Sequence, residues 1–182
     1  NTRQTDVRPA QSVSTAFQLV AVIFQLQSLQ QFGGVSATHL DWTMVPYVRK
    51  SFFKHYLIEY LKTTGEFYDL DLLNMDDDEL DDWVNEHKTQ YLTQMSLQFE
   101  DFKFENKDKL DKRLYQCALY ETLRETKQAV EGMYHNLNTL QSRSGNQLPF
   151  TSINYGTCTE PEGRMVTKAL LEVSIKGIGR LH

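Results

Sequence analysis

The sequence predicts a predominantly α-helical chain with one main strand near residues 148–155, as in a piece of an α/β fold. Three observations predict it. Several long stretches place apolar residues three or four positions apart, as one face of a helix requires. Residues 148–155 instead alternate their side chains between two faces, as an extended strand does. A helix precedes this strand and another follows it closely, and helix, strand and helix form the unit of α/β architectures.

The first predicted helix begins at Ser12 or Ser14, either of which can cap it, and runs to about Phe32. Apolar residues cover most of its circumference, so we expect it to be largely buried. Gly33 and Gly34 end it, because glycine adopts the left-handed conformation without a Cβ penalty.

The second predicted helix begins near Thr43 and runs to Thr63, before Gly65. Its apolar residues form one stripe at three- and four-residue spacing, and its charged residues lie mostly off that stripe. It should therefore be an amphipathic helix that covers a core. The residues placed off the stripe are Arg49, Lys50, Lys54 and Glu59.

Residues 66–108 change in character, with an acidic run over 76–82 at the start of another predicted helix. Carboxylates are favourable at the positive end of a helix dipole, so we interpret the run as a solvated first turn. A calcium loop is the alternative, but the run lacks a glycine at the sixth position and a correctly spaced closing glutamate. Phe99, Phe102 and Phe104 predict a connection that packs locally.

Residues 106–141 are strongly helical, with apolar residues at near-heptad intervals. Both a coiled-coil hairpin and a helix laid against a sheet fit this spacing. A last helix is predicted over 161–176, capped by Thr159 and broken by Gly177 and Gly179.

Composition restricts the function classes. A chain of 182 residues can build one good core, and its net charge of -5 argues against general nucleic-acid binding. The longest apolar run, residues 19–24, is far too short to span a membrane. The two cysteines are too few for a metal site or a disulfide framework. We therefore expect a reducing environment and a cytoplasmic protein. The chain begins with Asn1 rather than Met and stops abruptly at His182, so we expect it to be a piece of a longer protein.

Residues with catalytic potential are scattered. The common nucleophile, phosphate-loop and metalloprotease motifs are absent, and no catalytic or metal-binding residue is assigned. Cys117 lies on an apolar stripe as a small core residue, and Cys158 is interpreted as inert because no base or second cysteine lies near it in sequence. The histidines are interpreted as surface or packing residues, at positions 39, 55, 87, 135 and 182.

The end of the predicted strand is the best candidate for a functional edge. In α/β folds ligands bind at the carboxyl ends of strands, which here means residues 154–157. This edge is polar and suited to a polar ligand, but the residues alone do not name a reaction.

Several irregular strings in the sequence, taken together and in order, resemble the anaerobic (class III) ribonucleoside-triphosphate reductase family. The resemblance covers residues 12–63 and 109–182, whereas residues 66–108 have no recognised counterpart and are interpreted as an insertion or a divergent helical excursion. The strings are Gln31-Phe-Gly-Gly34, Val45-Pro-Tyr-Val-Arg-Lys50, Asn138-Thr-Leu140, Ser144-Gly-Asn-Gln-Leu-Pro-Phe150, Ser152-Ile-Asn-Tyr-Gly-Thr157, Glu162-Gly-Arg-Met-Val166 and Lys176-Gly-Ile-Gly-Arg180.

The resemblance implies that residues 1–182 are part of a ten-stranded α/β barrel made of two parallel halves. It implies reduction of ribonucleoside triphosphates to deoxyribonucleoside triphosphates, which supplies dNTPs for DNA replication. In the family a glycyl radical generates a thiyl radical on a finger-loop cysteine, formate is typically the reductant, and a radical-SAM enzyme installs the radical. A C-terminal cysteine cluster binds zinc, and ATP and dNTP effectors, often with an N-terminal ATP cone, give allosteric control. The expected assembly is a homodimer, with no membrane or nucleic-acid partner.

The resemblance also suggests site residues. Gly33 and Gly34 would let backbone N–H groups approach effector or other phosphate oxygens. Neither Cys117 nor Cys158 matches a catalytic or zinc position, so we expect this chain to be inactive alone and to contribute dimer and effector helices with a wall of the substrate site. That wall is Ser152, Asn154, Tyr155, Gly156 and Thr157.

Two hypotheses remain at this point. Under the reductase hypothesis, the strand at 148–155 pairs in parallel in the full protein and lies exposed or rearranged in this chain alone. The rival is a stand-alone helical interaction module without enzymatic activity, with residues 106–141 as its partner surface and the acidic run as a recruitment patch.

Overall fold

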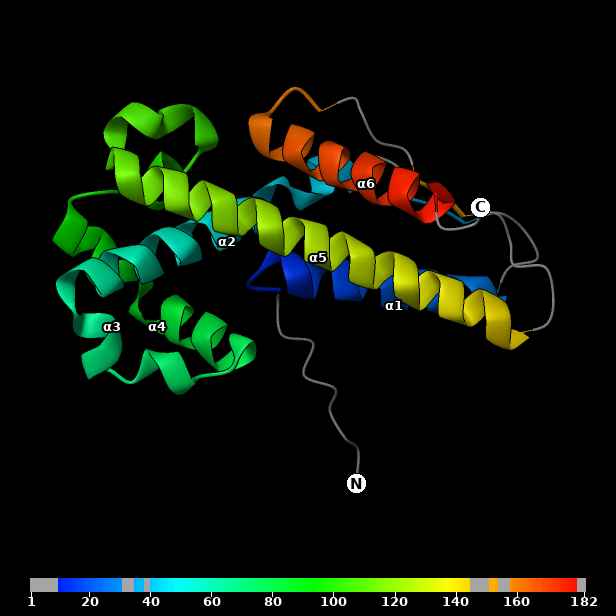
Figure 1. Cartoon of the computed structure of the whole chain (residues 1–182), viewed down its shortest axis with the longest axis horizontal. Helices are drawn as coiled ribbons and strands as arrows, with labels where there is room; N and C mark the ends of the chain where they lie inside the picture. Colours follow the sequence, from blue (N-terminus) through cyan, green and yellow to red (C-terminus); the bar gives the residue numbers. More distant parts are fainter. Residues whose placement is uncertain (1–9, 31–34, 38–39, 145–150, 154–157, 180–182) are drawn as a thin grey trace.

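The computed structural model describes residues 10–30, 35–37, 40–144, 151–153 and 158–179, and Figure 1 shows their arrangement. Within these ranges the chain is predominantly helical, and three short 3-10 turns connect its helices. The strands are β1 (Val35–Ala37) and β2 (Thr151–Ile153), and the 3-10 turns are Leu72–Asn74, Phe99–Asp101 and Phe104–Lys109. The α-helices are α1 (Val13–Gln30), α2 (Leu40–Thr64), α3 (Glu66–Asp69), α4 (Asp77–Met95), α5 (Lys112–Ser144) and α6 (Pro161–Gly179).

Helix α2 is the centre of the fold. The long helix α5 packs against α1 and α2, and α6 packs against α2 and α5. Helices α3 and α4 lie at the end of the molecule away from α6 (Figure 1). Because α2 has neighbours on several sides, Phe53, Leu61 and Lys54 are buried together with most of its predicted apolar stripe. The prediction that α2 merely covers a core with one face, leaving Lys54 outside it, is therefore wrong.

The two short strands form a parallel pair. Val35 pairs with Thr151 and Ala37 with Ile153, and the central pair is Ser36 with Ser152. The predicted strand is confirmed at residues 151–153, and the rest of 148–155 lies outside the described residues. The parallel pairing that was expected in the full protein is already present in this chain, because β1, a strand that was not predicted from the sequence, supplies the partner.

The segment after α4 enters the main core. The Phe52 ring lies edge-on to Phe102 and Phe104, with centroids 6.4 and 5.1 Å away, and Phe53 lies 4.9 Å from Phe102. Phe102 is fully buried. Edge-to-face contacts of this kind are the favoured geometry for aromatic pairs. The prediction that these phenylalanines pack only locally is wrong, since they fill the space beside α2.

Several helix boundaries follow the predicted signals. Ser12 Oγ accepts a 3.3 Å hydrogen bond from the Thr15 N–H, so Ser12 caps α1 as expected. Asp76 Oδ1 accepts a 2.8 Å hydrogen bond from the Glu79 N–H, which confirms that the acidic run opens a helix.

Other boundary predictions need correction. Helix α2 begins at Leu40, three residues before the predicted start, and contains Pro46 in its interior. Helix α6 continues to Gly179, so Gly177 does not break it. Helix α1 was predicted to be largely buried, but over the part whose side chains are described, residues 13–22, Leu19 and Val22 are exposed. No helix in the described part of the chain is long and apolar enough to cross a membrane.

Candidate functional site

The carboxyl ends of β1 and β2 meet at one edge of the parallel pair. Each strand leads into a helix: β1 ends at Ala37 and α2 begins at Leu40, and β2 ends at Ile153 and α6 begins at Pro161. Because Ala37 and Ile153 are register partners, both connections leave from the same edge. In α/β folds this edge, with helix amino ends beside it, is where ligands bind.

Asp41 joins the two connections. It lies in the first turn of α2 and is fully buried. Its Oδ2 accepts a 2.9 Å hydrogen bond from the Cys158 N–H, and its Oδ1 accepts one of 3.0 Å from the Trp42 N–H. A carboxylate that accepts backbone N–H groups at the positive end of a helix is held by charge-assisted hydrogen bonds. Asp41 therefore fixes the chain entering α6 to the start of α2.

Gly163 allows α6 to approach this joint closely. A Cβ placed on Gly163 would lie 2.2 Å from Cys158 Sγ and 3.3 Å from the Asp41 carbonyl oxygen. Real Cβ atoms do not approach other atoms at the shorter distance, so a side chain here would force the first turn of α6 away. Cys158 is buried beneath this turn. Its burial agrees with the interpretation of Cys158 as an inert packing residue.

A second set of contacts fixes α6 from the other side. Glu162 is fully buried, and its Oε1 accepts hydrogen bonds of 3.0 Å from the Phe104 N–H and 3.2 Å from Arg49 Nε. Arg49 also pairs with Glu160. The Tyr115 hydroxyl donates a 2.9 Å hydrogen bond to the Phe104 carbonyl, and burial, with the charge of Glu162 beside it, raises the pKa of Tyr115. These hydrogen bonds and ion pairs connect α2, α6 and the segment before α5.

The residues predicted to bind substrate lie around this joint in sequence. Ser152 is in β2, where its backbone is paired with Ser36, and its side chain is not among those described. The rest of the predicted wall lies between Ile153 and Cys158. Ile153 is held by its pairing with Ala37, and Cys158 by the hydrogen bond to Asp41. The other predicted residues lie outside the described ones: Asn154, Tyr155, Gly156, Thr157, Gly33 and Gly34.

Sequence reasoning missed the residues that fix this edge. Arg49 was placed off the apolar stripe of its helix, yet its Nε donates a hydrogen bond to Glu162, 113 positions away in the chain. Asp41 lay before the predicted start of its helix, so nothing marked it as a first-turn residue. The one available signal was the pair Glu160 and Glu162 at the start of α6, which predicted negative charge there but not its partner.

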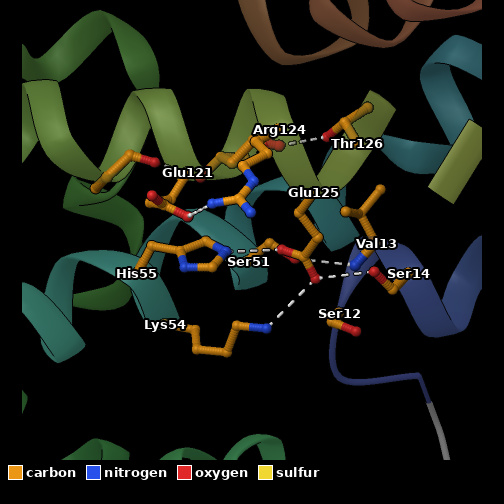
Figure 2. A network of polar contacts seen from close by, with 12 residues as sticks. Ser12, Val13, Ser14, Ser51, Lys54, His55, Glu121, Arg124, Glu125 and Thr126 are labelled. Carbon is orange, nitrogen blue, oxygen red and sulfur yellow. Dashed lines mark hydrogen bonds and ion pairs between the residues drawn. The ribbon is translucent and has the colours of Figure 1, made fainter. Parts of the chain in front are cut away.

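A separate buried ion cluster joins α2, α4 and α5, and Figure 2 shows its centre. Lys54 Nζ lies 3.0 Å from Asp81 Oδ1 and 3.3 Å from Glu125 Oε1. His55 Nε2 lies 2.8 Å from Glu125 Oε2, and the Ser14 hydroxyl donates a 3.2 Å hydrogen bond to Glu125. The histidine thus has a carboxylate partner 70 positions away, which the sequence could not reveal.

Protonation in this cluster follows from burial and pairing. Burial by itself would raise the pKa of Glu125, but the hydrogen bond from His55 and the charge of Lys54 prevail and hold this pKa at about 2. Burial opposes the charge of Lys54, but Glu125 and Asp81 raise its pKa. Burial, only partly offset by Lys54, raises the pKa of Asp81. The arrangement is a compensated ion cluster suited to holding helices together.

A polar cavity of about 530 Å³ opens beside the cluster. Its walls come from α1, α2, α5 and the beginning of α4 and are rich in carboxylates. The charged residues that line it are Lys54, His55, Asp76, Asp77, Asp78, Asp81, Glu121, Arg124 and Glu125. Among the residues that the structure describes, no group of three or more His, Cys, Asp or Glu side chains is arranged to hold a metal ion.

The family model described as "Anaerobic ribonucleoside-triphosphate reductase" matches residues 1–181, a range that includes residues 66–108. Among curated proteins, the chain is 24% identical over 174 residues to the anaerobic ribonucleoside-triphosphate reductase of Enterobacteria phage T4, covering 96% of this chain and 21% of that protein. It is 24% identical to the reductase of the same name from Haemophilus influenzae and 23% identical to that of Escherichia coli, covering 97% and 96% of this chain and 18% of each relative. The chain therefore spans about a fifth of the length of these relatives.

Proposed function

The chain belongs to the anaerobic ribonucleoside-triphosphate reductase family, and from this premise we propose that it forms one wall of the nucleotide site in such an enzyme. The proposed reaction is the radical reduction of a ribonucleoside triphosphate to the deoxyribonucleoside triphosphate. The family match favours this function over the stand-alone interaction module.

One observation carries the proposal: two parallel strands lead into helix amino ends at a shared edge, and the Asp41–Cys158 hydrogen bond holds the two connections together. A rigid edge of this kind positions whatever the following residues bind. In the proposed role the polar side chains of Ser152 and Asn154 contact the ribonucleotide, with Tyr155 and Thr157 beside them. Gly156 would leave its backbone N–H open to a phosphate oxygen.

The described residues do not themselves fit the radical or zinc chemistry of the family. Cys158 is buried under Gly163, Cys117 is half-buried on α5, and no described residues form a metal site. In the proposal, the catalytic cysteines, the glycyl radical, the zinc cysteines and the site that uses formate as the reductant lie in other parts of the protein. The residues here bind and orient substrate, and the proposed barrel, homodimer, activating radical-SAM enzyme and ATP or dNTP effectors complete the enzyme. Gly33 and Gly34 are proposed to approach effector or other phosphate groups.

The test measures the affinity for a ribonucleoside triphosphate in two variants of the full-length protein, Ser152→Ala and Asn154→Ala. We expect each substitution to weaken ribonucleoside-triphosphate binding about tenfold or more, because a buried substrate group then lacks its partner. The matched control is Asn136→Ala, at an exposed position on α5. Thermal unfolding of each variant separates a binding defect from a folding defect. Unchanged nucleotide affinity in both site variants would remove residues 152–157 from the substrate wall.

A further inference from the structure

The connection between α2 and α4, together with the beginning of α4, carries a surface that the proposed reductase function does not use. We call residues 66–82 the acidic surface. They contain no lysine or arginine, and their charge is therefore uniformly negative. Their exposed acidic residues are Asp69, Asp71, Asp76, Asp77, Asp78, Glu79 and Asp82. Glu66 is half-buried, and Asp81 is buried in the ion cluster with Lys54.

Large apolar side chains are exposed among these carboxylates. Tyr68 is 60% exposed, Leu70 44% and Leu73 67%. Their neighbours Phe67 and Leu72 are buried and anchor the segment. Exposed apolar residues that occur singly are ordinary, but here three lie within six positions of one folded segment. Exposed apolar groups rimmed by polar ones mark binding surfaces.

The backbone presents this patch in a defined conformation. Gly65 and Asp71 adopt the left-handed conformation, with φ of 84° and 56°. The Asp71 conformation is uncommon for a residue with a side chain, and its Oδ1 accepts a 2.7 Å hydrogen bond from Asn74 Nδ2 that supports it. The Tyr91 hydroxyl of α4 donates a 3.0 Å hydrogen bond to Glu66, which joins the start of the segment to the helix that follows it. The apolar side chains are thus held outward by a folded segment.

The polar cavity beside the ion cluster extends the negative field. Asp76, Asp77 and Asp78 belong both to the acidic surface and to the cavity wall. Lys54, deeper in that wall, is already paired with Asp81 and Glu125. Arg124 also lines the cavity, and Lys62, which lies over the Phe67 ring, is a positive group near the patch itself. The carboxylates outnumber these cations, so the field at the patch favours a positively charged partner.

We propose that the acidic surface docks a segment of a partner protein in which apolar residues alternate with lysine or arginine, as on one face of a basic amphipathic helix. The apolar residues of that helix would cover Tyr68, Leu70 and Leu73, and its basic residues would meet the surrounding carboxylates. Charge selects this occupant. A nucleic acid or an anionic membrane would bring negative charge to a negative surface, and a symmetric contact with a second copy would set the same acidic surface against itself. The proposal is independent of the nucleotide site.

The test uses a fluorescently labelled helical peptide of leucine and lysine at three- and four-residue spacing, with the full-length protein. The matched probe replaces every lysine by glutamate. We expect the lysine peptide to bind, with an affinity that falls as salt is added, and the glutamate peptide not to bind. Fluorescence anisotropy reports both affinities.

Two variants assign the binding to this surface. Leu70→Ser with Leu73→Ser should weaken binding of the lysine peptide about tenfold or more, since the apolar contact is lost. Asp77→Asn with Asp78→Asn should weaken it several-fold and reduce its salt dependence. The control is Leu171→Ser, at a leucine of α6 with the same 44% exposure as Leu70. Should the double leucine variant fail to fold, Tyr68→Ser makes the same test at one exposed position.

Three outcomes would overturn the proposal. Equal binding of the two peptides would show that charge does not select the occupant. Binding that survives both surface variants would place the contact elsewhere. A concentration-dependent dimer that Leu73→Ser abolishes would make a second copy of the chain the occupant instead.

Discussion

The Cys158 N–H donates a 2.9 Å hydrogen bond to Asp41 Oδ2, across 117 positions of the chain. This contact joins the beginning of α2 to the segment that enters α6. It lies at the edge where the two parallel strands end, so the stability of α6 and the geometry of the proposed nucleotide wall depend on the same carboxylate.

Asp41→Ala should destabilise the protein by about 2 kcal/mol, because it leaves buried N–H groups without an acceptor. Urea unfolding followed by circular dichroism measures the loss. Asp69→Ala, at an exposed aspartate of α3, is the control and should change stability little. Equal effects of the two substitutions would mean that the Asp41 contact is not a structural joint.

Gly163→Ala should destabilise the protein by about 1–3 kcal/mol, because the added Cβ collides with Cys158 beneath the first turn of α6. Gly132→Ala in α5 is the control, since a Cβ there meets nothing within 4 Å. That change should stabilise the helix by about 0.5–1 kcal/mol. Adding Cys158→Gly to Gly163→Ala should recover part of the loss, and a double variant no better than Gly163→Ala would contradict the proposed collision.

Lys54→Met should cost about 3–5 kcal/mol, because it leaves Asp81 and Glu125 as buried carboxylates without their shared cation. Chemical denaturation measures the change, and Lys112→Met at an exposed position on α5 serves as its control. A loss below about 1 kcal/mol would mean that the pairs behave as surface ion pairs do.

Glu125 should make the stability depend on pH in the acid range. Its pKa is lowered to about 2 in the folded protein, so its stabilising contribution is present above the pKa of the unfolded chain, near 4.5. The contribution is lost as the pH falls from about 4.5 towards 2, at about 1.4 kcal/mol per pH unit. Unfolding free energies of the wild type and Glu125→Gln, measured between these pH values, should converge as the pH falls. Glu131→Gln, exposed on the same helix, should not show this convergence, and parallel curves for Glu125→Gln would refute the assignment.

Much of the fold was predictable because its signals are local. Ser12 and Asp76 cap helices through atoms three residues away, and Pro161 opens α6 as expected. The strand at 151–153 was recognisable from its alternation and flanking turn residues. Its partner, β1, was not, because three residues between two helices carry too little pattern to distinguish a strand from a connection.

The candidate site was predictable only in its location. The strand end identified the edge, and the irregular strings around it identified the family. Asp41, Arg49 and Glu162, which fix that edge, find partners on distant segments, and no spacing rule connects positions more than 100 residues apart. His55 was interpreted as a surface or packing residue for the same reason, since its partner Glu125 is on another helix.

The sequence by itself determined the long helices to within a few residues, the position of one strand and the family to which the chain belongs, since periodicity, caps and motif strings are carried by neighbouring residues. Only the tertiary structure decided which residues are buried and paired. Lys54 and Glu162 look like solvated charges in the sequence, yet both lie in the interior. A buried charge requires a partner of opposite sign or a hydrogen-bond donor at the same place, and folding alone brings those groups together.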